Sequence, residues 1–138
     1  MQTFLPYDDF AKTARVLDYR RLGKQRIETK QLLNALLGRT KGWANHPAAR
    51  MWRGYEGMLC LYGICMCKEW RSRGYKDAQL PILRDEYLPL FDVVERPVWL
   101  GLPQVHASHR AALLYKAPEH YHQFGWTESP ELNYYWPV

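Results

Sequence analysis

Apolar residues recur at helical spacing in the first part of the chain. Phe10, Ala14 and Leu17 lie at i, i+4 and i+7, which is typical of one face of a helix that packs against a core. Two aspartates directly before Phe10 can cap the start of this helix. Gly23 interrupts the pattern, which then resumes and stops at Gly38. We therefore expect one long helix that bends near Gly23 and ends at Gly38.

A second apolar stripe at helical spacing covers residues 48–70. Asn45 or His46 can cap the start of this segment, and Pro47 fits the first turn of a helix because its missing N–H would have no partner there. We expect a single central helix that ends near residues 73–74, where an arginine is followed by a glycine.

The rest of the chain predicts shorter elements. Residues 75–103 contain four of the nine prolines and no sustained period, which indicates a long irregular connection with one short helix over 82–87. Pro103 is expected to open the last main helix, over 104–115, and Pro118 a further short turn. No segment alternates between apolar and polar residues as a β-strand does. The sequence therefore predicts an all-α fold, a compact single-domain helical bundle with long irregular connections.

Composition fits one globular domain over residues 1–138. With 47% hydrophobic residues, the chain can form one core. No apolar run has the length of a membrane span, and the first residues lack the order of a signal peptide. We therefore expect a cytoplasmic monomer without membrane association. The cysteine spacing fits neither a disulfide framework nor a zinc knuckle, so we expect reduced core thiols at Cys60, Cys65 and Cys67.

Charge is distributed unevenly along the chain. The 19 Lys and Arg against 14 Asp and Glu give a net charge of +5, which favours an anionic partner. Basic side chains concentrate in residues 12–30 and acidic ones in residues 77–95. Aromatic residues make up 14% of the chain and offer stacking surfaces for nucleobases as well as core packing. We expect one basic and one acidic side of the molecule.

Arg21 falls where the stripe of the first helix predicts a core residue. A guanidinium keeps its proton, so burying it is costly unless an anion meets it there. Lys24, Gln25 and Glu28 follow along the same edge of the helix. This cluster is either a solvated helix face or a site. Contacts with nucleic-acid phosphates would explain both the charge and the position of Arg21.

Histidines are the candidates for proton transfer. His106 and His109 stand one turn apart on the last main helix, and we expect both to lie outside the core. No carboxylate or third ligand follows at the spacing of a metal site, so we expect no metal and no cofactor. Ser108, His109 and Arg110 together suit anion binding or acid–base chemistry. His46 is either a helix cap or a site residue.

The segment Tyr19-Arg20-Arg21-Leu22-x-Lys24, which follows an acidic residue and a short N-terminal segment, resembles the phage endonuclease V-like pyrimidine-dimer DNA glycosylase/AP lyases. The resemblance is remote but extends over most of the chain. It is closest to an uncharacterised bacterial and phage branch of that superfamily, whose motifs stand here as Leu22-Gly23-Lys24-Gln25-Arg26, Asn45-His46-Pro47 with Met51-Trp52, Trp99-Leu100-Gly101, and Ser108-His109-Arg110.

The resemblance implies a compact helical fold whose N-terminus reaches the active site. It also implies a reaction in which an amine attacks C1′ of a nucleotide while a base is flipped out. The phage enzyme uses the amine of a Thr exposed by removal of Met, whereas Gln2 here disfavours that removal and leaves the amine on Met1. By register on Tyr19, Arg21 occupies the position of the family's catalytic Glu, and Glu28 is the nearest acid.

Our leading hypothesis is a DNA-binding base-excision enzyme, a glycosylase with or without AP lyase activity, that acts on a damaged or modified base flipped from duplex DNA. The alternatives are a non-catalytic DNA-binding module and a hydrolase or transferase on a small phosphorylated substrate. The catalytic candidates are Met1, Arg21, Lys24, Glu28, His46 and His109. The DNA-binding candidates, in which Trp43 would stack on a base or wedge into the duplex, are Arg20, Gln25, Arg26, Trp43, Asn45, Ser108, Arg110 and Lys116.

Overall fold

The computed structural model describes residues 1–138 and confirms the all-α prediction, because every regular element is helical. The main helices are α1 (Phe10–Val16), α2 (Tyr19–Leu36), α3 (Pro47–Trp52), α4 (Glu56–Ser72) and α6 (Pro103–Lys116). Shorter elements are α5 (Gln79–Ile82), a π turn (Leu83–Tyr87), a 3-10 turn (Leu88–Leu90), α7 (Pro118–Tyr121) and a final 3-10 turn (His122–Phe124). No helix is long and apolar enough to cross a membrane.

The expected long first helix is instead two helices, so that prediction was wrong. α1 ends at Leu17, whose backbone is extended, and Asp18 then caps α2 by accepting a hydrogen bond from the Arg21 amide. Gly23 lies inside α2, where a Cβ atom would sit 3.1 Å from the ring of Trp70. The break comes before Arg21, so Arg21 does not continue the apolar face of α1.

The expected central helix is also divided. Its start is confirmed, since His46 caps α3 by accepting a 3.0 Å hydrogen bond from the Ala48 amide. The single helix over 48–70 was wrong, because Gly54 turns the chain at φ +89° and α4 begins afresh at Glu56. A positive φ is open to glycine but strained for other residues, so this turn depends on Gly54.

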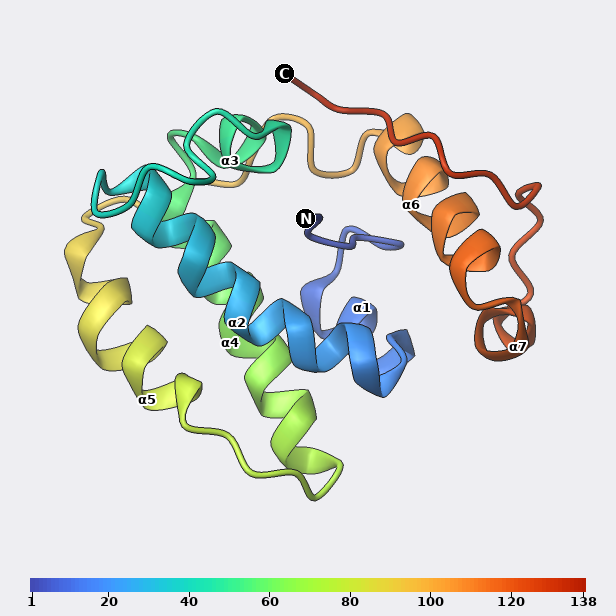
Figure 1. The fold of residues 1–138 in the computed structure, drawn as a ribbon, viewed down its shortest axis with the longest axis horizontal. Coiled ribbons are helices and arrows are strands. Elements are labelled where there is room, and N and C mark those ends of the chain that lie inside the picture. Colours follow the sequence, from blue (N-terminus) through green and yellow to red (C-terminus); the bar gives the residue numbers. More distant parts are fainter.

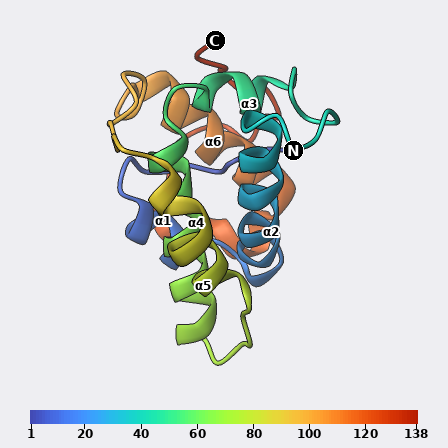
Figure 2. The same cartoon turned by 90° about the vertical axis from the view of Figure 1, so that its left-hand side faces the viewer.

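The core forms where α2 crosses α4, with α1 packed on α4 as well (Figure 1). Gly63 permits the close crossing, because a Cβ atom there would collide with Thr29 of α2 and Leu83. The largest fully buried side chains are Trp52 and Tyr62. α5 covers the side of the α2 and α4 pair that faces away from α6 (Figures 1 and 2).

The N-terminal segment, residues 2–6, is buried without forming a helix and lies between α2 and α6 (Figure 1). Buried backbone groups need hydrogen-bond partners, and here side chains supply them. The Phe4 amide donates to Gln25 of α2, and the Leu5 amide donates to His109 of α6 at 2.8 Å. The segment therefore bridges the two helices and brings the N-terminus next to Gln25 and Glu28, in the middle of α2.

The C-terminal tail runs back along α6 (Figure 1). The Glu131 amide donates to the Ala111 carbonyl at 3.1 Å, and the Tyr135 amide donates to the Ser108 hydroxyl at 3.0 Å. Arg110 adds a bidentate ion pair with Glu128, at 2.9 and 3.0 Å. These contacts place the tail opposite α2.

Candidate functional site

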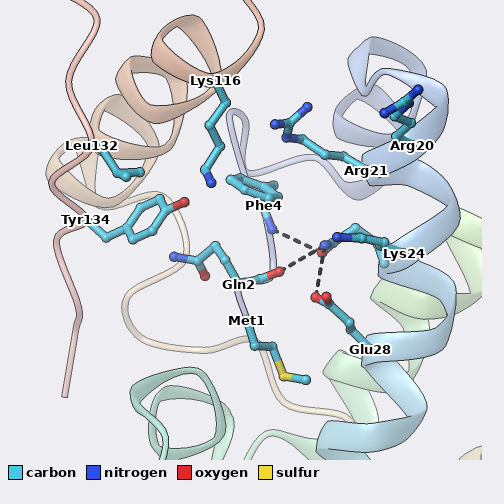
Figure 3. Close-up of a pocket in the computed structure, with 11 residues that line it drawn as sticks. Met1, Gln2, Phe4, Arg20, Arg21, Lys24, Glu28, Lys116, Leu132 and Tyr134 are labelled. Carbon is cyan, nitrogen blue, oxygen red and sulfur yellow. Dashed lines mark hydrogen bonds between the residues drawn. The ribbon is translucent and has the colours of Figure 1, made fainter.

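A cavity of about 660 Å³ opens where the N-terminal segment, α2, the end of α6 and the C-terminal tail meet (Figure 3). Its volume falls in the range of sites that bind small molecules or single nucleotides. The lining residues come from four separate parts of the chain: Met1, Gln2, Phe4, Arg20, Arg21, Lys24, Gln25, Glu28, Lys116, Leu132 and Tyr134.

Positive charge dominates this cavity. Arg20, Arg21 and Lys24 project from the first two turns of α2, and Lys116 faces them from the end of α6 (Figure 3). Glu28 is the only carboxylate in the lining. An excess of cations around an open cavity favours an anionic ligand, such as the phosphates of a nucleic acid.

Arg21 is anchored at the rim of the cavity by Asp18, with 3.2 Å between the guanidinium and the carboxylate. Burial alone would raise the pKa of Asp18, but hydrogen bonding from Tyr121 and the charge of Arg21 together hold it below its ordinary value. The carboxylate therefore stays ionised at neutral pH. This ion pair holds Arg21 on the cavity side of α2. Asp18 therefore supplies part of the negative charge that we expected beside the Arg21 guanidinium.

Glu28 is half-buried at the base of the cavity (Figure 3). Burial raises its pKa, and the amino group of Met1 and the charge of Lys24 offset only part of that effect. The backbone amide of Gln2 and the side chain of Gln25 also stabilise the carboxylate. A carboxyl group with a raised pKa, next to amino groups, is better suited than an ordinary one to accept a proton and return it.

Gln25 lines the cavity floor but is turned inward. Its side-chain carbonyl accepts hydrogen bonds from the Phe4 amide and the Tyr62 hydroxyl, at 3.2 and 2.7 Å. Its amide group donates to the Gln2 carbonyl at 2.9 Å and to Glu28 at 3.4 Å. Gln25 thus holds the N-terminal segment against α2, whereas the sequence suggested that it contacts DNA.

His109 does not reach the cavity, and the expectation that His106 and His109 lie outside the core was wrong. Both side chains are buried, and both contact the backbone of Leu5. His109 Nδ1 accepts a hydrogen bond from the Leu5 amide, and His106 Nδ1 lies 2.7 Å from the Leu5 carbonyl oxygen. Burial, together with the neighbouring His106, lowers the pKa of His109 to about 3. The ring is neutral, and Phe4 and Tyr134 pack against it.

His46, Trp43 and Asn45 form a separate group at the start of α3. The His46 ring contacts Trp43 and Trp136 edge to face, with centroids 5.3 and 5.8 Å apart. Burial, followed by the charge of the amino group at Met1, lowers the pKa of His46. None of the three lines the cavity. His46 is a helix cap, as one of the two sequence interpretations had it, and lies near the N-terminus.

Arg26, Ser108 and Arg110 are engaged within the protein. Arg26 pairs with the buried carboxylate of Asp77 and lies 4.5 Å from the centre of the Trp70 ring. Ser108 and Arg110 hold the C-terminal tail, and Arg110 also donates to the Pro6 carbonyl at 2.8 Å. Among the basic residues proposed to bind DNA, Arg20 and Lys116 therefore line the cavity, whereas Arg26 and Arg110 do not.

The neutral part of the lining was not predicted from the sequence. Gln2, Phe4, Leu132 and Tyr134 reach the cavity from the two ends of the chain. An aromatic tail alone does not indicate a site, since most such residues are core. Cavity-lining positions brought together by long-range packing leave no local pattern in the sequence.

Comparison with known proteins identifies one protein family that this chain matches. A family model described as pyrimidine dimer DNA glycosylase matches residues 1–82, which include the N-terminal segment, all of α2 and α4, and most of the cavity lining. No curated protein and no solved structure gives a significant match. The match covers more than half of the chain and includes Glu28 and the cationic residues of α2. The chain belongs to the pyrimidine dimer DNA glycosylase family.

Proposed function

We propose that this protein excises a damaged pyrimidine from duplex DNA, with the base flipped into the cavity lined by Arg21, Lys24 and Glu28. One observation carries the proposal: Glu28, with its raised pKa, lies beside the amino group of Met1 in a cavity whose other charged side chains are all cationic. Family membership supports a glycosylase. A flipped nucleotide needs such a cavity next to the groups that act on C1′.

The surface around the cavity suits a DNA strand. Two further hollows adjoin it along α2, and Arg20 lines all three. Lys24 borders one of the neighbouring hollows and Lys116 the other. A row of hollows with exposed cations between them can follow a phosphate backbone on either side of a flipped nucleotide.

The proposed chemistry starts at the amino group of Met1. Its nitrogen forms a bond to C1′ as the glycosidic bond breaks, and Glu28 takes the proton that the nitrogen loses and returns it to the departing base. Opening of the C1′–O4′ bond then moves a second proton from nitrogen to O4′ and leaves an imine. Lys24 is the other amine that borders Glu28 and is the alternative nucleophile.

The imine can end the reaction in two ways. Hydrolysis by water releases the enzyme and leaves an abasic site. Loss of a C2′ proton with departure of the 3′ phosphate nicks the strand, which is AP lyase activity. Arg21 and Lys24 would stabilise the departing phosphate. We propose the second course, because these cations lie on the same side of the cavity as Glu28 (Figure 3).

A duplex that carries one cyclobutane thymine dimer tests the function. We expect breakage of the dimer's 5′ glycosidic bond and a nick at the dimer, with an undamaged duplex of the same sequence left intact. Binding of the damaged duplex without either product would refute the proposal and leave the non-catalytic DNA-binding module. Failure to bind either duplex would refute both the glycosylase proposal and the DNA-binding module.

Arg20→Ala should weaken DNA binding and reduce its salt dependence. Each lost phosphate contact lowers the slope of log K against log salt by about one. Arg20 is exposed at the junction of the three hollows, so its loss should cost one such contact. Anisotropy titrations of a labelled duplex over a range of salt concentrations measure the slope.

Arg84→Ala is the matched control, since it removes the same charge from an exposed arginine outside these hollows. Its slope should equal that of the wild type. Equal slopes for all three proteins would show that Arg20 does not meet a phosphate.

A further inference from the structure

The cationic side chains that line the cavity differ in how firmly the protein holds them. Those of Arg20, Lys24 and Lys116 are in no ion pair. Arg21 is the exception, because its guanidinium pairs with the Asp18 carboxylate at 3.2 Å. An ion pair restricts the rotamers of a long side chain. Arg21 is therefore the one cation of the cavity whose orientation is fixed by a charged partner.

Tyr121, the last residue of α7, holds this partner in place. Its side chain is fully buried, and its ring is stacked on Trp126 with centroids 5.5 Å apart. The Tyr121 hydroxyl donates a hydrogen bond to Asp18 Oδ1 and accepts one from the Asp18 backbone amide at 3.0 Å. A buried, stacked ring has little freedom to move. Tyr121 thus fixes both the backbone and the side chain of Asp18.

Only one nitrogen of the Arg21 guanidinium binds Asp18. Nη1 donates to the two carboxylate oxygens at 3.2 and 3.3 Å, whereas Nε and Nη2 have no partner in the protein. Nε and Nη2 form the edge of a guanidinium that can bind two oxygens of one phosphate. Arg21 lines the cavity and a neighbouring hollow, and Figure 3 shows it between Arg20 and Lys116, which line both as well.

We propose that Tyr121 is a positioning residue, which acts through Asp18 to hold the Nε and Nη2 edge of Arg21 toward a DNA phosphate at the mouth of the cavity. A guanidinium that is already oriented loses less rotamer freedom when it binds, so it binds more tightly than a mobile one. Tyr121 lies outside residues 1–82, which match the family model. The inference rests on the proposed function, from which it takes duplex DNA as the ligand.

Tyr121→Phe tests the role of the hydroxyl, because it removes one oxygen and no charge. The probe is a duplex that carries a tetrahydrofuran abasic analogue, which has no base to lose, so that binding is measured without excision. Tyr121→Phe should weaken binding about three- to tenfold, the range expected for one lost hydrogen bond. Tyr115→Phe is the matched control and should bind as the wild type does, because Tyr115 is exposed and lies outside the cavity.

Double-mutant cycles separate positioning of Arg21 from any other effect of Tyr121. In the Arg21→Gln protein the guanidinium is absent, so adding Tyr121→Phe should reduce the affinity no further. In the Arg20→Ala protein, Tyr121→Phe should reduce the affinity by the same factor as in the wild type. Equal losses in all three backgrounds, or no loss in the wild type, would overturn the inference.

Asp18→Asn is the second variant, because asparagine caps a helix about as well as aspartate. The substitution removes a negative charge from a cationic surface, which by charge alone would tighten DNA binding. We expect weaker binding instead, because the ion pair that orients Arg21 is lost. Tighter or unchanged binding would overturn the inference. Thermal melting checks the fold of each variant, and if Tyr121→Phe does not fold, the result for Asp18→Asn decides.

Excision of a thymine dimer by the wild type is measured separately. If the wild type binds the tetrahydrofuran duplex but excises no dimer, the proposed function fails, and the double-mutant cycles still decide the role of Tyr121. If the wild type binds and excises but the cycles show equal losses, only the inference fails. A wild type that binds no duplex would overturn both.

Discussion

Glu28→Gln should lower the rate of dimer excision by about 10²- to 10⁴-fold, the usual contribution of a general acid–base group. The amide can neither take the proton from the attacking amine nor return it to the departing base. Binding to the damaged duplex should be kept or strengthened, because one negative charge leaves a cavity that holds phosphates. Single-turnover excision and anisotropy titrations measure the two effects separately.

The same substitution should not destabilise the protein at neutral pH. Burial raises the pKa of Glu28 above its ordinary value of 4.5, so the neutral acid is favoured by folding and the stability that it contributes is lost as the pH rises through the raised pKa. Gln cannot ionise, so the melting temperature of the variant at pH 7 should equal or exceed that of the wild type. Wild-type excision should rise over the same pH window as the carboxylate forms.

Glu86→Gln is the control, because Glu86 is an exposed acid outside the cavity. It should leave excision unchanged. Wild-type excision rates in Glu28→Gln would contradict the role given to Glu28, and a marked fall in its melting temperature at pH 7 would show that the carboxylate is structural.

Arg26→Ala should destabilise the fold by roughly 3 kcal/mol, the scale expected when one partner of a buried ion pair is removed. The Asp77 carboxylate is fully buried, and Arg26 is its closest cation, with Arg71 at 3.4 Å. Burial alone would raise the pKa of Asp77, but the Leu80 amide and Arg26 hold it below its ordinary value. The charge therefore remains when Arg26 is lost. Urea unfolding at pH 7 measures the change.

Comparison of Arg26→Ala with Arg15→Ala decides whether Arg26 stabilises the fold or contacts DNA. Arg15 is exposed on α1, so its loss should change the free energy of unfolding by less than about 0.5 kcal/mol. If Arg26→Ala melts like Arg15→Ala but binds DNA with a reduced salt slope, Arg26 is a phosphate contact, as the sequence suggested. We expect the opposite result, with stability lost and the salt slope kept.

The starts of α1, α3 and α6 were predictable from the sequence, whereas the breaks before α2 and α4 were not. His46 with Pro47, and Pro103, are signals whose chemistry acts within a few residues. The break at Gly54 falls inside the apolar stripe of residues 48–70, and the break at Leu17 falls between two positions, Leu17 and Arg21, that keep helical spacing. Periodicity alone cannot register such a break, because the buried faces of both helices meet the same core.

The structure brings together those predicted site residues that lie on a single helix. Arg20, Arg21, Lys24 and Glu28 share α2, so helical spacing was enough to bring them together, and all of them line the cavity. Gln2 and Tyr134 meet only through the packing of the chain ends, which helical spacing does not encode. His109 was misplaced because its neutral ring is stabilised by a backbone amide over 100 residues away in the sequence, at Leu5.

The central claim is that an amine beside Glu28 attacks C1′ in this cavity, and borohydride trapping tests it most directly. Incubation of the wild-type protein with a dimer-containing duplex and borohydride should give a covalent protein–DNA adduct by reduction of the imine. Peptide mapping should place the adduct on the peptide that begins at Met1, whereas an adduct on Lys24 would transfer the nucleophile to α2. Dimer excision without any adduct would contradict the claim, since base loss would then proceed by attack of water.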